Sequence, residues 1–202
     1  CDLVGSTALS ERLDPEELRA VIRAYQESAA QVIEGFAGHI AQYLGDGLLV
    51  YFGHPVAHED DAQRAVRAGL GIISAMRERN ARLMNDAQAP LSVRIGIHTG
   101  VVVVGDVGGG TRHERLALGD TPNLAARLQA LAEPDTVVIS ERTRQLAGGS
   151  FEYADLGEHA LKGITQPTRA WRIAGISDAA SRFEAATHAG LTPLVGREQE
   201  IG

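Results

Sequence analysis

The chain is 202 residues long, enough for one well-packed domain with an extension but too short for two full enzymes. Its 44% hydrophobic and 22% charged residues are typical of a globular protein rather than a disordered chain. The formal net charge of −7 argues against nucleic-acid binding, because such surfaces gather Lys and Arg to neutralise phosphates.

The single cysteine, Cys1, allows no disulfide within the chain, and no apolar run reaches the ~20 residues needed to cross a bilayer. We therefore expect a cytoplasmic segment with no secretory leader and no membrane partner. The histidines lack the spacing of metal ligands, so we expect them to pack or to lie at the surface, and we expect no zinc site.

The first predicted elements are a short strand and a long helix. Residues 1–4 have the character of the end of a strand. A helix is predicted between Asp14 and Gly38, because Asp14 can cap its first turn and Pro15 suits the first helical position. Apolar residues then recur at helical spacing, which supports the same prediction.

A β-hairpin is predicted next. Residues 39–52 form two strand-like runs around Gly45-Asp46-Gly47, and Asp-Gly between apolar runs is a strong hairpin signal. Asp46 would lie at its tip. A second helix is predicted for residues 59–85, where acidic residues open the segment and small residues indicate close packing.

The remaining elements complete an α+β pattern. Strands are predicted for residues 91–97, 101–107 and 115–118, with the glycines 108–110 as a turn, then a helix at 121–131, a strand at 136–139, a helix at 141–146 and irregular strands over 151–173. This order predicts a ferredoxin-like βαββαβ core with additional strands and a protruding β-hairpin arm.

Two acidic residues, Asp2 and Asp46, are the central candidates for chemistry. Each lies where a strand meets a turn, and the two strands should be neighbours in the sheet. Two carboxylates at such a point could bridge two Mg²⁺ ions, which suits phosphoryl-transfer chemistry. A lone Asp-Gly, by contrast, more often only shapes a turn.

Two further groups of residues could contact a phosphorylated ligand. Gly5-Ser6-Thr7 lies at a helix start, where free backbone N–H groups can bind phosphate oxygens, although most such runs are plain loops. Asn123 and Arg127 stand four residues apart and share one helix face. The amide could orient a ribose and the guanidinium could neutralise charge on a phosphorus, but the spacing alone also fits two solvated residues.

Several separated motifs, in the same order, resemble the class III adenylyl/guanylyl cyclase catalytic domain over nearly all of residues 1–173. The resemblance is strongest to bacterial adenylate cyclase-like domains. The motifs are Cys1-Asp2-Leu3-Val4-Gly5-Ser6-Thr7, Tyr43-Leu44-Gly45-Asp46-Gly47, Arg94-Ile95-Gly96-Ile97-His98-Thr99-Gly100 and Leu118-Gly119-Asp120-Thr121-Pro122-Asn123-Leu124-Ala125-Ala126-Arg127.

This resemblance implies a role for each candidate residue. Asp2 and Asp46 would hold two Mg²⁺ (or Mn²⁺) ions per site, with the Leu3 carbonyl as an additional ligand. Asn123 would position the ribose, and Arg127 would stabilise the pentavalent phosphorus and the departing pyrophosphate.

Further implications concern the triphosphate and the oligomeric state. Leu161-Lys162-Gly163 resembles the segment that supplies a lysine to the triphosphate, although a surface lysine fits Lys162 nearly as well. In the family, the metal residues and the Asn/Arg pair of one site come from opposite chains. A homodimer of this chain would therefore build two symmetric sites.

Base choice is left open by the sequence. Adenylyl cyclases of the family usually have a Lys and an Asp or Thr at the positions of Gln42 and Leu116, and guanylyl cyclases a Glu and a Cys. We expect an adenylate cyclase that converts ATP to cyclic AMP. The alternatives are a guanylate or mixed-specificity cyclase, a catalytically inactive nucleotide-binding regulatory domain, and a purely dimerising module.

The end of the chain has a different character. We expect the catalytic domain to cover residues 1–173 and a linker rich in Ala, Ser, Thr and Asp to cover residues 174–192. Residues 193–202 resemble the entry to an ATPase module of the kind found after cyclase domains in large bacterial regulators.

Overall fold

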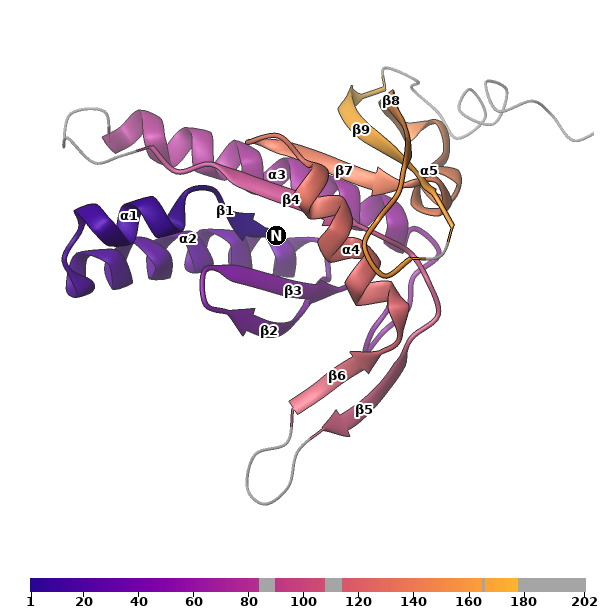
Figure 1. Cartoon of the computed structure of the whole chain (residues 1–202), viewed down its shortest axis with the longest axis horizontal. Coiled ribbons are helices and arrows are strands. Elements are labelled where there is room, and N and C mark those ends of the chain that lie inside the picture. Colours follow the sequence, from indigo (N-terminus) through magenta and orange to yellow (C-terminus); the bar gives the residue numbers. More distant parts are fainter. Residues whose placement is uncertain (84–89, 108–113, 165, 178–202) are drawn as a thin grey trace, which may run out of the picture.

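The computed structural model describes residues 1–83, 90–107, 114–164 and 166–177 (Figure 1). Its helices are α1 (Ser6–Arg12), α2 (Pro15–Gly35), α3 (Asp61–Leu83), α4 (Asp120–Leu131), α5 (Glu141–Ala147) and the 3₁₀ helix η1 (Gly148–Ser150). Its strands are β1 (Asp2–Leu3), β2 (His39–Leu44), β3 (Gly47–Tyr51), β4 (Val93–Ile97), β5 (Val103–Val107), β6 (Glu114–Leu118), β7 (Thr136–Ser140), β8 (Phe151–His159) and β9 (Thr168–Ile176).

One seven-stranded sheet organises the domain, in the order β2-β3-β1-β4-β7-β9-β8. Strand β1 is antiparallel to both β3 and β4, and the connections β1-α2-β2-β3-α3-β4 make the predicted βαββαβ core. Strand β7 extends this core parallel to β4, and β9 and β8 follow antiparallel. The predicted α+β class with a ferredoxin-like core and additional strands is therefore confirmed.

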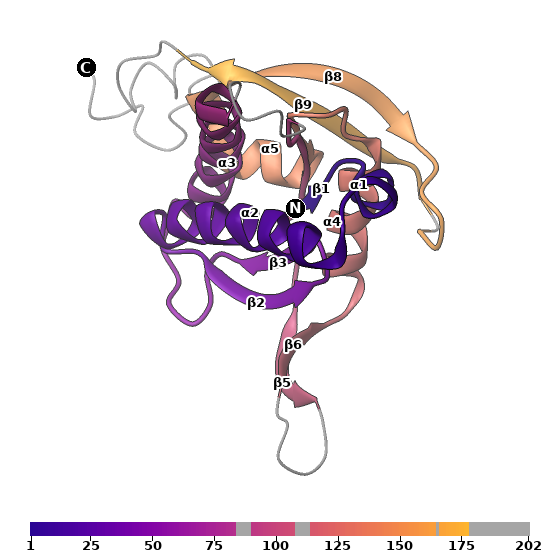
Figure 2. The same cartoon turned by 90° about the vertical axis from the view of Figure 1, so that its left-hand side faces the viewer.

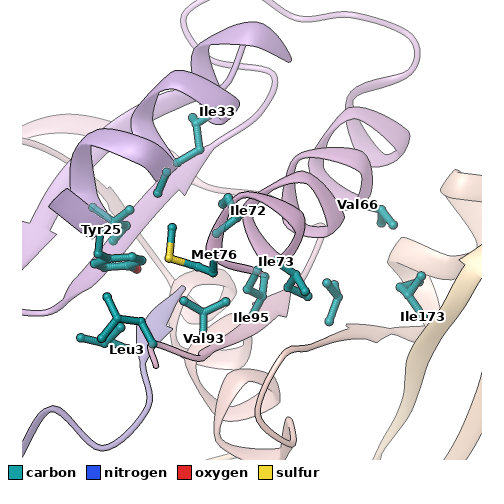
Figure 3. Packing of buried hydrophobic residues seen from close by; sticks show 14 of the residues in the cluster. Leu3, Tyr25, Ile33, Val66, Ile72, Ile73, Met76, Val93, Ile95 and Ile173 are labelled. Atoms are coloured by element: carbon teal, nitrogen blue, oxygen red, sulfur yellow. The ribbon is translucent and has the colours of Figure 1, made fainter. Parts of the chain in front are cut away.

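Helices cover the two faces of the sheet. On one face α2 and α3 pack together over the main core, which includes Tyr25, Ile72 and Val93 (Figure 3). On the other face α4 lies directly on β4 at Gly96, where a Cβ atom would come within 2.2 Å of the carbonyl oxygen of Ala125. Gly96 thus permits a close helix–strand approach that no side chain would allow.

The start of α2 shows how local chemistry fixes an element. The Asp14 carboxylate accepts hydrogen bonds from the backbone N–H groups of Glu16 and Glu17 at 2.9 and 2.8 Å. The Glu17 side chain accepts in turn from the Asp14 N–H, which completes a capping box. Such a cap contributes about 1 kcal/mol, and the predicted helix start is confirmed.

Strands β5 and β6 pair only with each other and project from the body of the domain, as both views show (Figures 1 and 2). This pair, called the arm below, confirms the predicted protruding hairpin. The turn predicted at residues 108–110 lies outside the described residues.

Three features differ from the sequence-based expectation or extend it. A helix start was expected at Gly5-Ser6-Thr7, but α1 was not predicted as a separate helix of seven residues, because it buries only Leu9 and carries little periodic signal. The segment expected as irregular strands is an antiparallel hairpin of β8 and β9, and its irregularity consists of register shifts between Glu152 and Tyr153 and between Asp155 and Gly157. Strand β9 continues to Ile176, so the first residues of the predicted linker belong to the sheet.

The rest of the predicted linker from residue 178, and the predicted ATPase entry at residues 193–202, lie outside the described residues. Within the described ranges, no helix has both the length and the apolar character needed to span a membrane.

Candidate active site

Asp2 and Asp46 are brought together by the pairing of β1 with β3. Asp2 lies opposite Gly47 in this antiparallel pair, and Asp46 immediately precedes Gly47 in the turn between β2 and β3. Burial and, after it, the negative charge of Asp46 raise the pKa of the Asp2 carboxyl. The two carboxylates are therefore close enough to interact electrostatically, which makes this point favourable for cations.

The donor set at this point suits a hard divalent cation. The oxygens of Asp2 and Asp46 are of the type that Mg²⁺ and Mn²⁺ prefer, and the backbone carbonyl of Leu3 directly follows Asp2 in the chain. Gly47 keeps the Asp2 carboxylate accessible, because a Cβ there would lie 3.2 Å from Asp2 Oδ1. The described residues contain no group of three or more His, Cys, Asp or Glu suited to a metal, so carbonyl, phosphate or water oxygens would complete the coordination.

Arg94 is a further candidate site residue, which the sequence alone did not indicate as a ligand contact. It lies directly opposite Asp2 in the β1–β4 pair, so the two side chains share one face of the sheet. Its Nε is buried and has no hydrogen-bond partner within the described part of the chain. A guanidinium beside the Asp2 carboxylate could bind a phosphate oxygen. The available signal was a charge between the apolar residues Val93 and Ile95 of a core strand.

Asn123 and Arg127 share a face of α4, as predicted, and both are exposed. The opposite face of the helix rests on Gly96 through Ala125 and Gln129. Since successive helical residues are rotated by about 100°, Asn123 and Arg127 lie on the side of α4 that faces away from its own sheet. One chain therefore does not bring this pair to its own Asp2 and Asp46.

The candidate phosphate-binding run, Gly5-Ser6-Thr7, begins three residues after Asp2. Gly5 adopts a left-handed conformation with φ 71° and directly precedes α1, which begins at Ser6. The Gly5 carbonyl accepts the first helical hydrogen bond, from the Leu9 N–H at 3.0 Å. Ser6 and Thr7 thus form the first turn of α1, near the end of β1 that carries the candidate metal ligands.

The remaining candidates lie on other elements. Gln42 is half-buried in β2, just after a register shift between Ile40 and Gln42. Leu116 lies in β6 opposite Gly105. Lys162 is exposed in the connection between β8 and β9, at the sheet edge opposite β2. Gln42 thus shares the β2–β3 hairpin with Asp46, whereas Leu116 and Lys162 lie on elements that do not pair with β1.

A cavity of about 460 Å³ lies beside Asp2 but has the wrong lining for a triphosphate. It lies between β3 and β4. Strand β1, which runs between them, consists only of Asp2 and Leu3 and is too short to fill this space. Its walls are largely apolar and include Leu48, Val50, Ile72, Ile95 and Ile97. A triphosphate requires cations and hydrogen-bond donors, so we interpret this cavity as a gap in the sheet.

His98, in the motif that resembles the family's core strand, forms a hydrogen bond within the protein and is partly buried. Its Nδ1 lies 2.8 Å from Ser140 Oγ, which is itself within 3.1 Å of Thr143 Oγ1. Burial and then the nearby Arg142 lower the pKa of His98. The imidazole is therefore favoured in its neutral form.

Comparisons with known proteins identify the family. The model for the adenylate and guanylate cyclase catalytic domain matches residues 1–175, and the chain belongs to this family. Members of this family, the class III cyclases, generally use divalent metal ions.

Two proteins of Rhizobium meliloti (strain 1021) are among the relatives. An uncharacterized protein is 38% identical over 99% of this chain and 19% of its own length. Adenylate cyclase 1 is 29% identical over 93% of this chain and 29% of its own length. The chain thus spans less than a third of the length of either relative.

Two solved structures share the fold closely. The guanylyl cyclase Cya2 has a TM-score of 0.83 and 36% identity, with 88% of this chain and 90% of that chain covered. The adenylyl cyclase CyaB from P. aeruginosa has a TM-score of 0.82 and 30% identity, with 85% and 89% covered. The chain is thus similar to cyclases of both base specificities.

Proposed function

We propose that this chain is an adenylate cyclase that converts ATP to 3′,5′-cyclic AMP and pyrophosphate at sites shared by two copies of the chain. The observation that carries the proposal is the arrangement of its two functional pairs. Asp2 and Asp46 meet at one point of the sheet, whereas Asn123 and Arg127 are exposed on the outer side of α4. A second copy is needed to join them.

The metal-binding half of each site would come from one chain. Asp2, Asp46 and the Leu3 carbonyl would hold two Mg²⁺ or Mn²⁺ ions, which supply Lewis-acid activation of the ribose 3′-hydroxyl and charge neutralisation on the triphosphate. Arg94 and the backbone N–H groups of residues 5–7 would bind phosphate oxygens on the same side.

The partner chain would supply the transition-state half. Its Asn123 would hold the ribose so that the 3′-oxygen stands in line with the α-phosphorus, and its Arg127 would neutralise charge on the five-coordinate phosphorus. The 3′-oxygen forms a bond to the α-phosphorus, the bond to the bridging oxygen breaks, and pyrophosphate leaves. The hydroxyl proton passes to solvent, and Lys162 is proposed to contact the triphosphate.

Exposed apolar side chains support the dimer. Tyr43 and Leu44, beside the Asp46 turn, are each 53% exposed. Val101 and Val103, where the arm begins, are 82% and 66% exposed. Grouped apolar exposure of this kind is typical of protein–protein contact surfaces.

Guanylate or mixed specificity is the second candidate, because Gln42 and Leu116 match neither base-recognition scheme and because Cya2, a guanylyl cyclase, is 36% identical. An amide can pair with either purine edge, whereas Leu116 could offer only apolar contact. A nucleotide-binding domain without turnover is the third candidate.

A product assay separates these candidates. Purified protein is incubated with ATP or with GTP, in Mg²⁺ and in Mn²⁺, and cyclic AMP and cyclic GMP are quantified beside an Asp46→Asn variant. We expect cyclic AMP from the wild type and none from the variant. Cyclic GMP in excess would establish the second candidate, and bound nucleotide without any cyclic product would establish the third.

A further inference from the structure

Two consecutive residues of α2 contact the two segments that carry the proposed metal ligands. Gln26 Nε2 donates a hydrogen bond to the carbonyl oxygen of Gly45, at a distance of 2.8 Å. Gly45 directly precedes Asp46 and adopts a left-handed conformation with φ 65°. The Tyr25 hydroxyl lies 3.2 Å from the Sγ of Cys1, the neighbour of Asp2.

From these contacts we infer that Gln26 is a positioning residue, which fixes the turn that presents Asp46 and so sets the geometry of the proposed metal pair. The inference rests on the proposed metal site. It concerns how this chain holds one ligand relative to the other, and Gln26 itself touches neither metal nor nucleotide.

The sheet holds one side of the turn, because Gly47 pairs with Asp2 and the Leu48 N–H donates to the Cys1 carbonyl at 2.8 Å. The other side is held less firmly. Tyr43 and Leu44, on the approach to the turn, are each 53% exposed, and a Cβ placed on Gly45 would meet nothing within 4 Å. Within the described part of the chain, the Gln26 amide makes the side-chain hydrogen bond that ties this turn to another element. Packing therefore restrains residues 43–45 only weakly, and the hydrogen bond from Gln26 fixes this side of the turn.

The helix that provides this hydrogen bond is itself fixed relative to Asp2. Tyr25 is fully buried and packs beside Leu3 and Met76 in the core (Figure 3). Burial and the charges of Asp2 and Asp46 raise the pKa of Tyr25, which places its hydroxyl in the field of both carboxylates. Helix α2 is thus fixed relative to the strand that carries Asp2, and Gln26 connects this helix to the turn that carries Asp46.

The expected size of the effect follows from an ordinary hydrogen bond. Its loss corresponds to roughly a 2- to 12-fold change in an equilibrium. If the turn holds Asp46 in position for a smaller fraction of the time, the apparent metal affinity falls in proportion to that fraction. The global fold, which depends on the core below α2, should be nearly unaffected.

The experiment compares the full 202-residue chain with Gln26→Leu, which keeps the side-chain size and removes the donor, and with Glu27→Gln as the matched control. Glu27 pairs with Arg23 on the exposed side of the same helix and does not contact the turn. Three quantities are measured: the melting temperature, amide hydrogen exchange in metal-free protein, and Mn²⁺ affinity from the electron paramagnetic resonance of the free ion.

For Gln26→Leu we expect faster exchange confined to residues 43–47 and an Mn²⁺ dissociation constant raised roughly 2- to 12-fold, with the melting temperature close to that of the wild type. Glu27→Gln should match the wild type in all three quantities. If Gln26→Leu does not fold, Gln26→Ser, which is too short to reach Gly45, is expected to show the same pattern.

Unchanged exchange at the turn or unchanged Mn²⁺ affinity would overturn the inference, as would a loss of affinity that accompanies general loss of stability. The proposed catalytic function is judged separately by product formation in the wild type. A wild type that binds Mn²⁺ but makes no cyclic nucleotide would refute the proposed function. The role of Gln26 would still be decided by the exchange and binding data alone.

Discussion

The contact between α4 and β4 at Gly96 offers the sharpest structural prediction. A Cβ at residue 96 would lie 2.2 Å from both the Ala125 carbonyl oxygen and the Gln129 backbone nitrogen. Ordinary contacts need about 3.5 Å, and backbone atoms cannot rotate away as a flexible side chain can. Gly96→Ala should therefore displace α4 by about 1 Å, which overpacks the interface at a cost of about 3 kcal/mol.

This displacement should affect both stability and activity. A loss of about 3 kcal/mol lowers the melting temperature of a domain of this size by about 6 to 12 °C. Because α4 carries Asn123 and Arg127, a shift of about 1 Å should also reduce turnover about 100-fold.

Thermal denaturation and cyclic-nucleotide formation measure these two effects, and Gly35→Ala serves as the control. A Cβ at residue 35, the last residue of α2, would meet nothing within 4 Å, so this variant should be as stable as the wild type or slightly more stable. If Gly96→Ala melts within about 1 °C of the wild type, the close packing of α4 on β4 is refuted.

Three other predictions follow from the site. Asp46→Asn should reduce activity more than about 1000-fold. It should not lower the stability of the metal-free protein at neutral pH, because it removes a charge that raises the pKa of Asp2 in the folded state. Activity and melting curves at pH 7.5 test both effects. His98→Gln should reduce the loss of stability on acidification below about pH 6.5, since the folded-state pKa of His98 is lowered and the unfolded chain binds the proton more readily; the melting temperature as a function of pH tests this, and equal pH dependence in both proteins would contradict it. Replacing Gln42 by Lys together with Leu116 by Asp should raise the ratio of ATP to GTP turnover about 10-fold, and an unchanged ratio of the two kcat/KM values would exclude these positions from base recognition.

The fold was predictable where local chemistry decides it. The Asp14 cap with Pro15 defined the start of α2, and the Gly45-Asp46-Gly47 signal defined the hairpin, because each depends on residues close together in sequence. The extent of helix α1 escaped prediction, because its seven residues have little amphipathic pattern and bury only Leu9.

The candidate site was predictable in its residue types and in the proximity of Asp2 to Asp46, but not in its other spatial relations. The motifs pointed to Asp2 and Asp46, and the β1–β3 pairing brings them together as expected. Arg94 was not singled out, because its place beside Asp2 depends on a pairing between strands about 90 residues apart in the chain. The outward direction of Asn123 also required the structure, since it follows from the packing of α4 on Gly96.

The central claim, a cyclase site completed by two chains, is tested most directly by complementation. Asp46→Asn and Arg127→Ala chains are prepared separately, assayed alone, and then coexpressed and assayed as the purified mixture. Each variant alone should be inactive. In the mixture about half of the dimers are heterodimers, and each contains one intact site of two, so about a quarter of wild-type activity should return. A mixture as inactive as its parents would contradict the shared site.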